Sequence, residues 1–235
     1  MWMRADLKMR AKQAVHRNYW SAVVVALVMT VITAIFSSSG ANSVRGDHSF
    51  FGDSYFSRFS LLYAAFASII AIVSVAMIVL DVFVGNVLLV GGHRFFILNQ
   101  TETPTAGTLA YGFKSGSYGN VVLVMFMRDL FTFLWALLFL VPGIIKYYEY
   151  RMVPYILAEN PAMSKEEAFL ISKKMMMGQK WNTFVLDLSF IGWIFLSACT
   201  WGLVGIFYSE PYRQATLAEL YAANRTIAYQ NGYIR

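Results

Sequence analysis

Long apolar segments alternate with short polar ones along most of this chain. Residues 121–141, for example, are almost wholly apolar, and about 20 such residues are enough to cross a bilayer as a helix. The pattern predicts an all-α fold, a polytopic transmembrane helix bundle of about six spans within a single integral membrane domain covering 1–235. The expected spans are 19–37 (span 1), 60–98 (a long span 2), 120–141 (span 3), 144–159 (span 4), 182–199 (span 5) and 203–224 (span 6).

The polar segments between the spans have helical patterns of their own. Residues 3–18 place Leu7, Ala11, Ala14 and Val15 on one side of a helix and basic residues on much of the rest, which favours a helix lying on anionic lipid. Residues 164–178 form a second amphipathic helix on the cytoplasmic side. The remaining connections are an extracellular loop at 38–58 and a cytoplasmic segment at 104–118.

The second amphipathic helix has recognisable ends. Ser164 and Glu167 form a capping box, in which each side chain bonds a backbone amide of the first turn. Gly178 stands where a glycine commonly ends a helix, and Trp181 marks the membrane interface before the next apolar segment.

The segment 60–98 is longer than one span needs and contains Asp81 and Gly85. Two spans would require a turn, for which Asp81-Val82 is a poor sequence. We therefore favour one long helix, bent near Gly85, that begins outside the membrane.

A weak internal repeat accompanies the spans. A basic residue followed by an aromatic one recurs as Arg17 to Trp20, Lys114 to Tyr118 and Lys180-Trp181, each time before an outward span, an outside turn and a returning span. The pattern allows three helix-hairpin repeats, with chance similarity as the alternative.

Composition supports a membrane protein. Hydrophobic residues make up 58% of the chain, charged residues only 14%, and the mean hydropathy is +0.53. The net charge of +6 fits cytoplasmic lysines and arginines, with both termini inside. The aromatic residues of the chain lie within apolar segments, which argues against nucleic-acid binding. The basic start mimics a signal peptide, but Phe36-Ser-Ser-Ser-Gly lacks a clear cleavage site, so we expect the first span to be retained.

Charged residues at membrane depth are the most informative candidates for a site. Each costs about 2.5–3.5 kcal/mol at the bilayer centre, so they should face inward and pair. Three hypotheses remain: an ionic clamp between helices, a polar cavity for a headgroup, peptide or ion, and charges that lie at the interfaces. The candidates are Arg128, Asp129, Glu149, Arg151, Asp187, Glu210 and Arg213.

Four residues are candidate hinges: Pro142, Gly143, Pro154 and Pro211. The alternative is a packing kink whose freed carbonyl a neighbouring group satisfies. We interpret His93 as a structural residue at the membrane interface. We expect no metal site, no cofactor and no catalytic residues, because no ligand spacing, nucleophile with a base, or phosphate-binding loop is found.

Several motifs together resemble one bacterial family of integral membrane proteins, catalogued as domain of unknown function nine-seven-five. They are Pro142-Gly143-Ile144, Pro154 to Ala158, Ser172 to Gly178, Leu186 to Trp193, and Glu210-Pro211-Tyr212 with Tyr221. More distantly, the pattern is similar to the membrane domain of some glycerophosphodiester phosphodiesterases. The resemblance implies a bacterial plasma membrane and supplies no activity.

Three function classes follow from these observations. We favour a non-enzymatic accessory or scaffold for another membrane system, with the lipid bilayer and anionic inner-leaflet lipid as partners. A membrane-protein partner or self-association would fit that role. The alternative is a carrier or receptor for a lipid, peptide or small polar solute that uses the mid-membrane charges. A membrane enzyme is the third class.

Overall fold

The computed structural model describes residues 2–41 and 53–232, with the side chains of all of these except 35–41, 53–65 and Leu140. Over those residues the chain is helical and has no strand, which confirms the predicted all-α class. Residues 42–52, within the expected loop at 38–58, lie outside the described residues. The α-helices are α1 (Arg4–Arg17), α2 (Tyr19–Ala41), α3 (Asp53–Leu80), α4 (Asn86–Leu98), α5 (Tyr111–Lys114), α6 (Tyr118–Leu138), α7 (Leu140–Glu149), α8 (Val153–Glu159), α9 (Lys165–Met175), α10 (Lys180–Leu188), α11 (Ile191–Cys199) and α12 (Glu210–Gln230). Two π-helical turns, η1 (Asp81–Gly85) and η3 (Gly205–Ser209), and a 3₁₀ turn, η2 (Ala106–Ala110), complete them.

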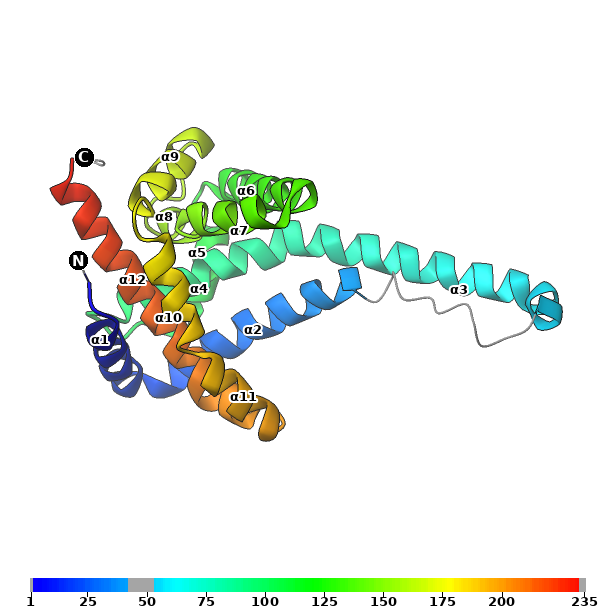
Figure 1. Cartoon of the computed structure of the whole chain (residues 1–235), viewed down its shortest axis with the longest axis horizontal. Helices are drawn as coiled ribbons and strands as arrows, with labels where there is room; N and C mark the ends of the chain where they lie inside the picture. The colour runs from blue at the N-terminus through cyan, green and yellow to red at the C-terminus, as the bar shows by residue number, and fades with distance from the viewer. Residues whose placement is uncertain (1, 42–52, 233–235) are drawn as a thin grey trace.

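Three helical hairpins extend from a common bundle in the described part of the chain (Figure 1). They are α2 with α3, α6 with α7, and α11 with the segment leading through η3 into α12. The outgoing helix of each hairpin follows a shorter helix, namely α1, α5 or α9 with α10. This order agrees with the helix-hairpin units that the sequence suggests.

The described residues contain three or four candidate membrane spans, fewer than the six expected. By length and composition, three helices within the described residues could cross a membrane: Phe66–Leu98, Tyr118–Leu138 and Lys180–Cys199. A fourth is reached if α1 and α2, which meet at 108°, form one broken span. The total of six spans therefore stays a prediction.

The sixth expected span, 203–224, is where the structure differs most from the hydrophobic pattern. Leu203 starts a helix that continues through η3 into α12 and ends at Gln230. This helix is not among the candidate spans, and α12 packs against α1, α2 and α4. Many of its apolar residues, including Ala215 and Leu220, are buried against protein, and the helix is too polar to count as a candidate span.

The segment 60–98 forms one continuous helix, α3–η1–α4, that widens into a π turn at Asp81–Gly85. The irregularity therefore lies beside Gly85, where we expected a bend. A π turn interrupts the regular hydrogen-bond ladder. The Tyr118 hydroxyl donates to the Phe83 carbonyl within it at 2.8 Å, so the start of α6 satisfies the distorted turn.

The turn between α6 and α7 comes earlier in the chain than Pro142-Gly143, where the sequence predicted it. α6 ends at Leu138, Phe139 is extended, and α7 begins at Leu140, so Pro142 lies in the first turn of α7. Proline fits there because a first-turn amide has no helical acceptor. A Cβ on Gly143 would lie 2.6 Å from the Ala136 Cα, so glycine at this position allows α6 and α7 to pack closely.

The expected spans 144–159 and 182–199 are each interrupted. Residues 150–152 form a turn between α7 and α8, and residues 189–190 form one between α10 and α11. The buried Ser172 side chain bridges the first turn: its hydroxyl donates to the Glu149 carbonyl at 2.6 Å and accepts from the Met152 amide at 3.2 Å. This serine therefore has a structural role.

The amphipathic helices turn their apolar faces inward. Leu7, Ala11, Ala14 and Val15 of α1 are buried, and α1 packs on α12, so the face expected on lipid contacts protein instead. α9 is shorter than the expected 164–178. Its Ser164 hydroxyl accepts from the Glu167 amide, as the capping box predicts, and Gly178 has a φ of +74°.

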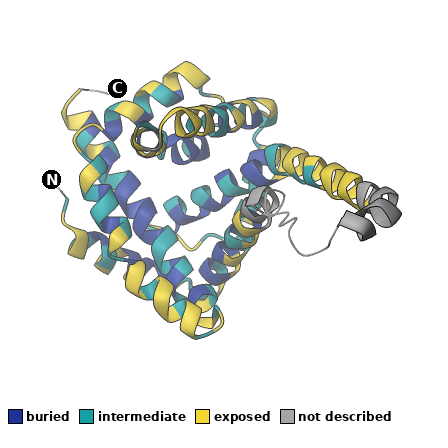
Figure 2. Ribbon diagram, turned by 45° about the vertical axis from the view of Figure 1, so that its right-hand side comes forward, coloured by how far each residue is buried: buried dark blue, intermediate teal, exposed yellow. Residues whose placement is uncertain are grey.

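Burial is concentrated where the hairpins meet (Figure 2). From Phe66 to Leu80, the projecting part of α3 has exposed apolar side chains, including Ile72 and Val75. This distribution suits a helix that contacts lipid or another membrane protein.

Candidate functional site

Six of the seven charged candidates form pairs with one another. Arg151 and Asp187 make the best-defined pair, with Nη1 2.5 Å from Oδ2 and Nη2 2.8 Å from Oδ1. This two-point contact joins the turn between α7 and α8 to α10. The Tyr148 hydroxyl also donates to Asp187, at 3.0 Å. The Arg151 side chain is only 9% exposed and that of Asp187 is 30% exposed, so this pair is a clamp between elements.

The other two pairs are local. Arg128 contacts its neighbour Asp129 at 2.5 Å, and Arg213 contacts Glu210 at 3.0 Å across one helical turn. Asp129 also accepts from Asn86 of α4 at 2.9 Å, which links α6 to the long helix. Neither arginine is used to join two helices directly.

Glu149, the seventh candidate, binds two lysines instead of an arginine. Its carboxylate lies 2.6 Å from Lys146 Nζ and 2.5 Å from Lys180 Nζ. Lys180 begins α10, so this contact is a second link between the α7 end and α10. Sequence inspection missed both lysines because it looked for partners only among charges counted as mid-membrane.

A cavity of about 470 Å³ lies between α2, α4, α6, the α7–α8 segment and α12. Arg128, Arg151 and Arg213 all line it. Asp129 lines it too, but Asp187 and Glu210, the partners of the other two arginines, do not. The wall is therefore more cationic than the three ion pairs would suggest. The structure thus supplies both a clamp and a cavity, which the sequence presented as alternatives.

Several polar atoms at this cavity lack partners. The Tyr155 hydroxyl, His93 Nδ1 and Gln214 Oε1 are enclosed and have no hydrogen-bond partner among the described residues. Tyr155 is 3% exposed, and its ring lies 4.1 Å from the His93 ring, centre to centre. Sequence reasoning missed Tyr155 and Gln214 and assigned His93 to the interface. The sequence offered one signal for each residue. Tyr155 follows the candidate hinge Pro154, Gln214 follows the candidate Arg213, and His93 follows the glycine pair Gly91-Gly92.

The candidate prolines sit in the first turns of helices. Pro154 lies near the start of α8, and Pro211 near the start of α12, directly after the π turn η3. Pro211 has no amide hydrogen to bond the Phe207 carbonyl one turn earlier. The Tyr19 hydroxyl of α2 donates to that carbonyl at 2.8 Å. This is the arrangement expected of a kink satisfied by a neighbour.

Tyr19 and Tyr118 therefore make equivalent hydrogen bonds. Each lies at the start of an outgoing helix and bonds a phenylalanine carbonyl in the π turn of a different hairpin's returning helix, Phe207 or Phe83. Lys180, at the start of α10 just before the third hairpin, contacts Glu149 of the second hairpin. The three hairpins are thus joined in a closed ring of contacts.

Among the described residues, no group of three or more His, Cys, Asp or Glu side chains is placed to hold a metal ion.

The comparison with protein families identifies one segment. Residues 140–227 match the family described as Protein of unknown function (DUF975), which confirms the resemblance over that part of the chain. The matched segment includes α7 through most of α12, and so contains Arg151, Asp187 and Arg213. No curated protein and no solved structure matches the chain. The more distant similarity to phosphodiesterase membrane domains stays a prediction.

Proposed function

We propose that this protein, whose residues 140–227 match a family of unknown function, is a non-enzymatic membrane receptor or carrier for a small anionic group. The observation that carries the proposal is the cavity between α4, α6, α8 and α12, where an enclosed tyrosine hydroxyl without a partner stands beside arginines. The group would be a phosphate or carboxylate of a polar solute or of a lipid headgroup.

The unpartnered atoms support a bound polar ligand. A buried hydrogen-bonding group without a partner costs about 1–3 kcal/mol, so native proteins rarely leave several at one place. The Tyr155 hydroxyl and His93 Nδ1 lie at one cavity of about 470 Å³, which is large enough for a small ligand. A ligand that accepts a hydrogen bond from the Tyr155 hydroxyl and exchanges one with His93 Nδ1 would remove that cost.

The lining charges support an anion over a cation. Guanidinium groups form strong, directional hydrogen bonds with carboxylates and phosphates. Arg151 uses Nη1 and Nη2 on Asp187, and Arg213 uses Nη1 on Glu210, so each has further N–H groups beyond those contacts. Because Asp187 and Glu210 lie off the cavity wall, Asp129 is the one acidic residue among the described residues that line the cavity, against three arginines.

Thermal unfolding of the purified protein tests this proposal. Inorganic phosphate and glycerol 3-phosphate should raise the melting temperature in a saturable way, because a ligand that binds only the folded state stabilises it. Choline at equal ionic strength should not. Tyr155→Phe and Arg213→Gln should weaken the effect, and Lys165→Gln, an exposed residue away from the cavity, should not. Equal shifts in all variants would contradict the proposal.

A second candidate is the accessory or scaffold role that the sequence favours. The apolar segment Phe66–Leu98 supports it, because none of its most apolar stretch is buried within the protein. Such a surface suits another membrane protein or a second copy of this chain as well as lipid. Crosslinking in the native membrane through cysteines placed at Ile72 and Val75 should then capture a stoichiometric partner, and capture of none would argue against this role.

The location belongs to the proposal as well: a multi-pass protein of a bacterial plasma membrane with both termini cytoplasmic. The basic helix α1 and the lysines of α9 support that orientation. In a Cys199→Ser background, a membrane-impermeant thiol reagent should label Asp47→Cys in intact cells. Lys173→Cys should be labelled only after permeabilisation, and the reverse result would overturn the orientation.

A further inference from the structure

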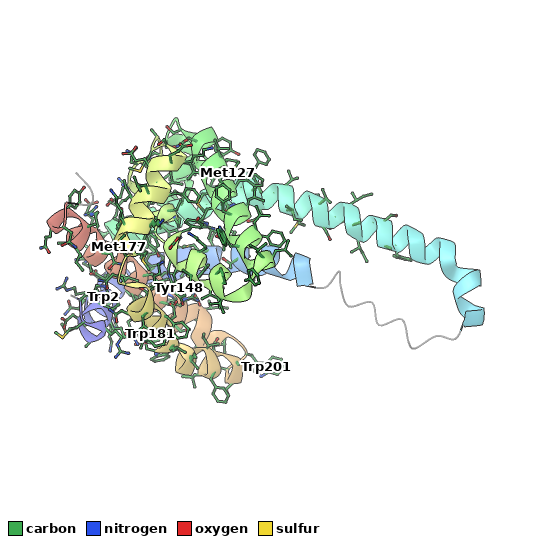
Figure 3. All side chains as sticks on the ribbon, turned by 45° about the horizontal axis from the view of Figure 1, so that its top comes forward. Trp2, Met127, Tyr148, Met177, Trp181 and Trp201 are labelled. Carbon is green, nitrogen blue, oxygen red and sulfur yellow. The ribbon has the colours of Figure 1, made fainter. Side chains whose placement is uncertain are left out.

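A groove of about 850 Å³ separates α1 from α10, away from the cavity described above. Trp2, Arg4 and Lys8 line one side, and Trp181, Asn182 and Ser189 line the other. Figure 3 shows Trp2 and Trp181 on the same side of the molecule, beside α1. None of the residues that line the groove is acidic.

The groove lies at the start of a candidate membrane span. α1 meets α2 at 108°, so α1 runs along the surface if α2 crosses the bilayer. α10 begins the candidate span Lys180–Cys199, which places Trp181 at its entrance. Trp181 is 72% exposed, and exposed tryptophans are enriched where the headgroups meet the hydrocarbon.

Two cations at this groove lack acidic partners. Neither Arg4 nor Lys8 makes an ion pair with a carboxylate among the described residues, although Asp6 lies between them in sequence. Lys8 Nζ instead contacts the Ser189 carbonyl at 3.4 Å and lies 4.5 Å from the centre of the Phe190 ring. Burial and the nearby Arg4 charge lower the pKa of Lys8, which is the environment of a cation that lacks a counter-ion.

An apolar track continues from the groove along the next helix. Ile191, Ile194 and Phe195 of α11 are exposed, and they follow Ser189 along the candidate span Lys180–Cys199. A ligand with a charged head at Lys8 could therefore lay an acyl chain along α11. A soluble anion would leave this track unused, so the surface favours a lipid.

We propose that the groove between α1 and α10 binds the phosphodiester headgroup of an anionic phospholipid, with Arg4 and Lys8 contacting the phosphate and the acyl chains lying along α11. The site would fix α1 on the membrane surface through its polar side, while its apolar side packs on α12. It does not depend on the cavity proposed as the receptor site, because none of the residues lining the groove lines that cavity.

Native mass spectrometry of the delipidated full-length protein tests this inference. Dioleoylphosphatidylglycerol, titrated in detergent, should bind at low stoichiometry and more tightly than dioleoylphosphatidylcholine. Lys8→Gln and Arg4→Gln should each lower the affinity for the anionic lipid about fivefold, since one basic residue near an anionic surface contributes an effect of that size. Lys12→Gln removes the same charge from the same helix outside the groove and should leave the affinity unchanged.

Three results would overturn the inference. They are equal affinity for the two lipids, equal weakening by Lys12→Gln, and complete displacement of the lipid by glycerol 3-phosphate, which would assign a soluble anion. If Lys8→Gln does not fold, Arg4→Gln decides the question, because Arg4 is exposed and its loss leaves no gap in the core. Unchanged lipid binding in Tyr155→Phe separates this site from the cavity.

Discussion

The ion pair of Arg151 and Asp187 predicts a different loss of stability for the removal of each partner. Asp187→Asn removes the charge that Arg151 faces and keeps the shape of the side chain. Arg151→Met removes the guanidinium and keeps most of its volume. Because Arg151 is much more deeply buried than Asp187, the first change should destabilise the protein more than the second.

The magnitudes follow from what each change leaves behind. Breaking a buried ion pair by removing one partner costs about 3–5 kcal/mol, so Asp187→Asn should cost about 3 kcal/mol. In Arg151→Met, the remaining Asp187 carboxylate is partly solvated and keeps its hydrogen bond from Tyr148. Solvent screening then reduces the cost to roughly 1–2 kcal/mol. For a chain of this length, each kcal/mol lowers the melting temperature by about 2–4 °C.

Thermal unfolding of the single and double variants in one detergent measures both costs and the coupling between them. The double variant should lose less than the sum of the two single changes, by roughly 1–3 kcal/mol. Glu166→Gln breaks an exposed pair with Lys165 and should have almost no effect. An unchanged melting temperature in Asp187→Asn, or strict additivity, would refute the clamp.

Further changes test the packing of the hairpins and of α12. Gly143→Ala should cost about 1–3 kcal/mol in unfolding assays, because its Cβ would meet the backbone of Ala136; a neutral result would place the hairpin wrongly. Tyr19→Phe should cost about 1 kcal/mol, since the Phe207 carbonyl loses its donor, and unaltered stability would argue against that bond. Burial raises the pKa of Glu219, so its ionised form opposes folding above that pKa. Glu219→Gln should therefore raise the melting temperature at pH 7.5, and this gain should shrink as pH falls toward the ordinary glutamate range; a constant difference would contradict the assignment.

The helical class and the hairpin order could be predicted because apolar length and charge are local properties of the sequence. The long helix to Leu98, its irregularity near Gly85 and the Ser164 cap are features of this kind. Each depends on residues adjacent in the chain. The position of a turn was less predictable: Pro142 looked like a helix end, but it occupies a first turn, where its missing amide hydrogen is harmless.

The site depended on contacts between distant segments, which one sequence does not reveal. The charged residues could be listed, but Arg151 could have paired with Glu149 as readily as with Asp187, and the lysine partners of Glu149 were overlooked. Tyr155 looked like one of many aromatic residues. Its enclosed hydroxyl became evident only when α4, α8 and α12 were seen to meet around one cavity.

The most direct test of the receptor proposal is native mass spectrometry of the protein extracted gently from its own membrane. The account predicts a defined adduct carrying phosphate or carboxylate that is retained by the wild type and by Lys8→Gln but lost from Tyr155→Phe and Arg213→Gln. Absence of an adduct that survives Lys8→Gln, a stoichiometric second polypeptide in its place, or equal retention of that adduct by the cavity variants would contradict it.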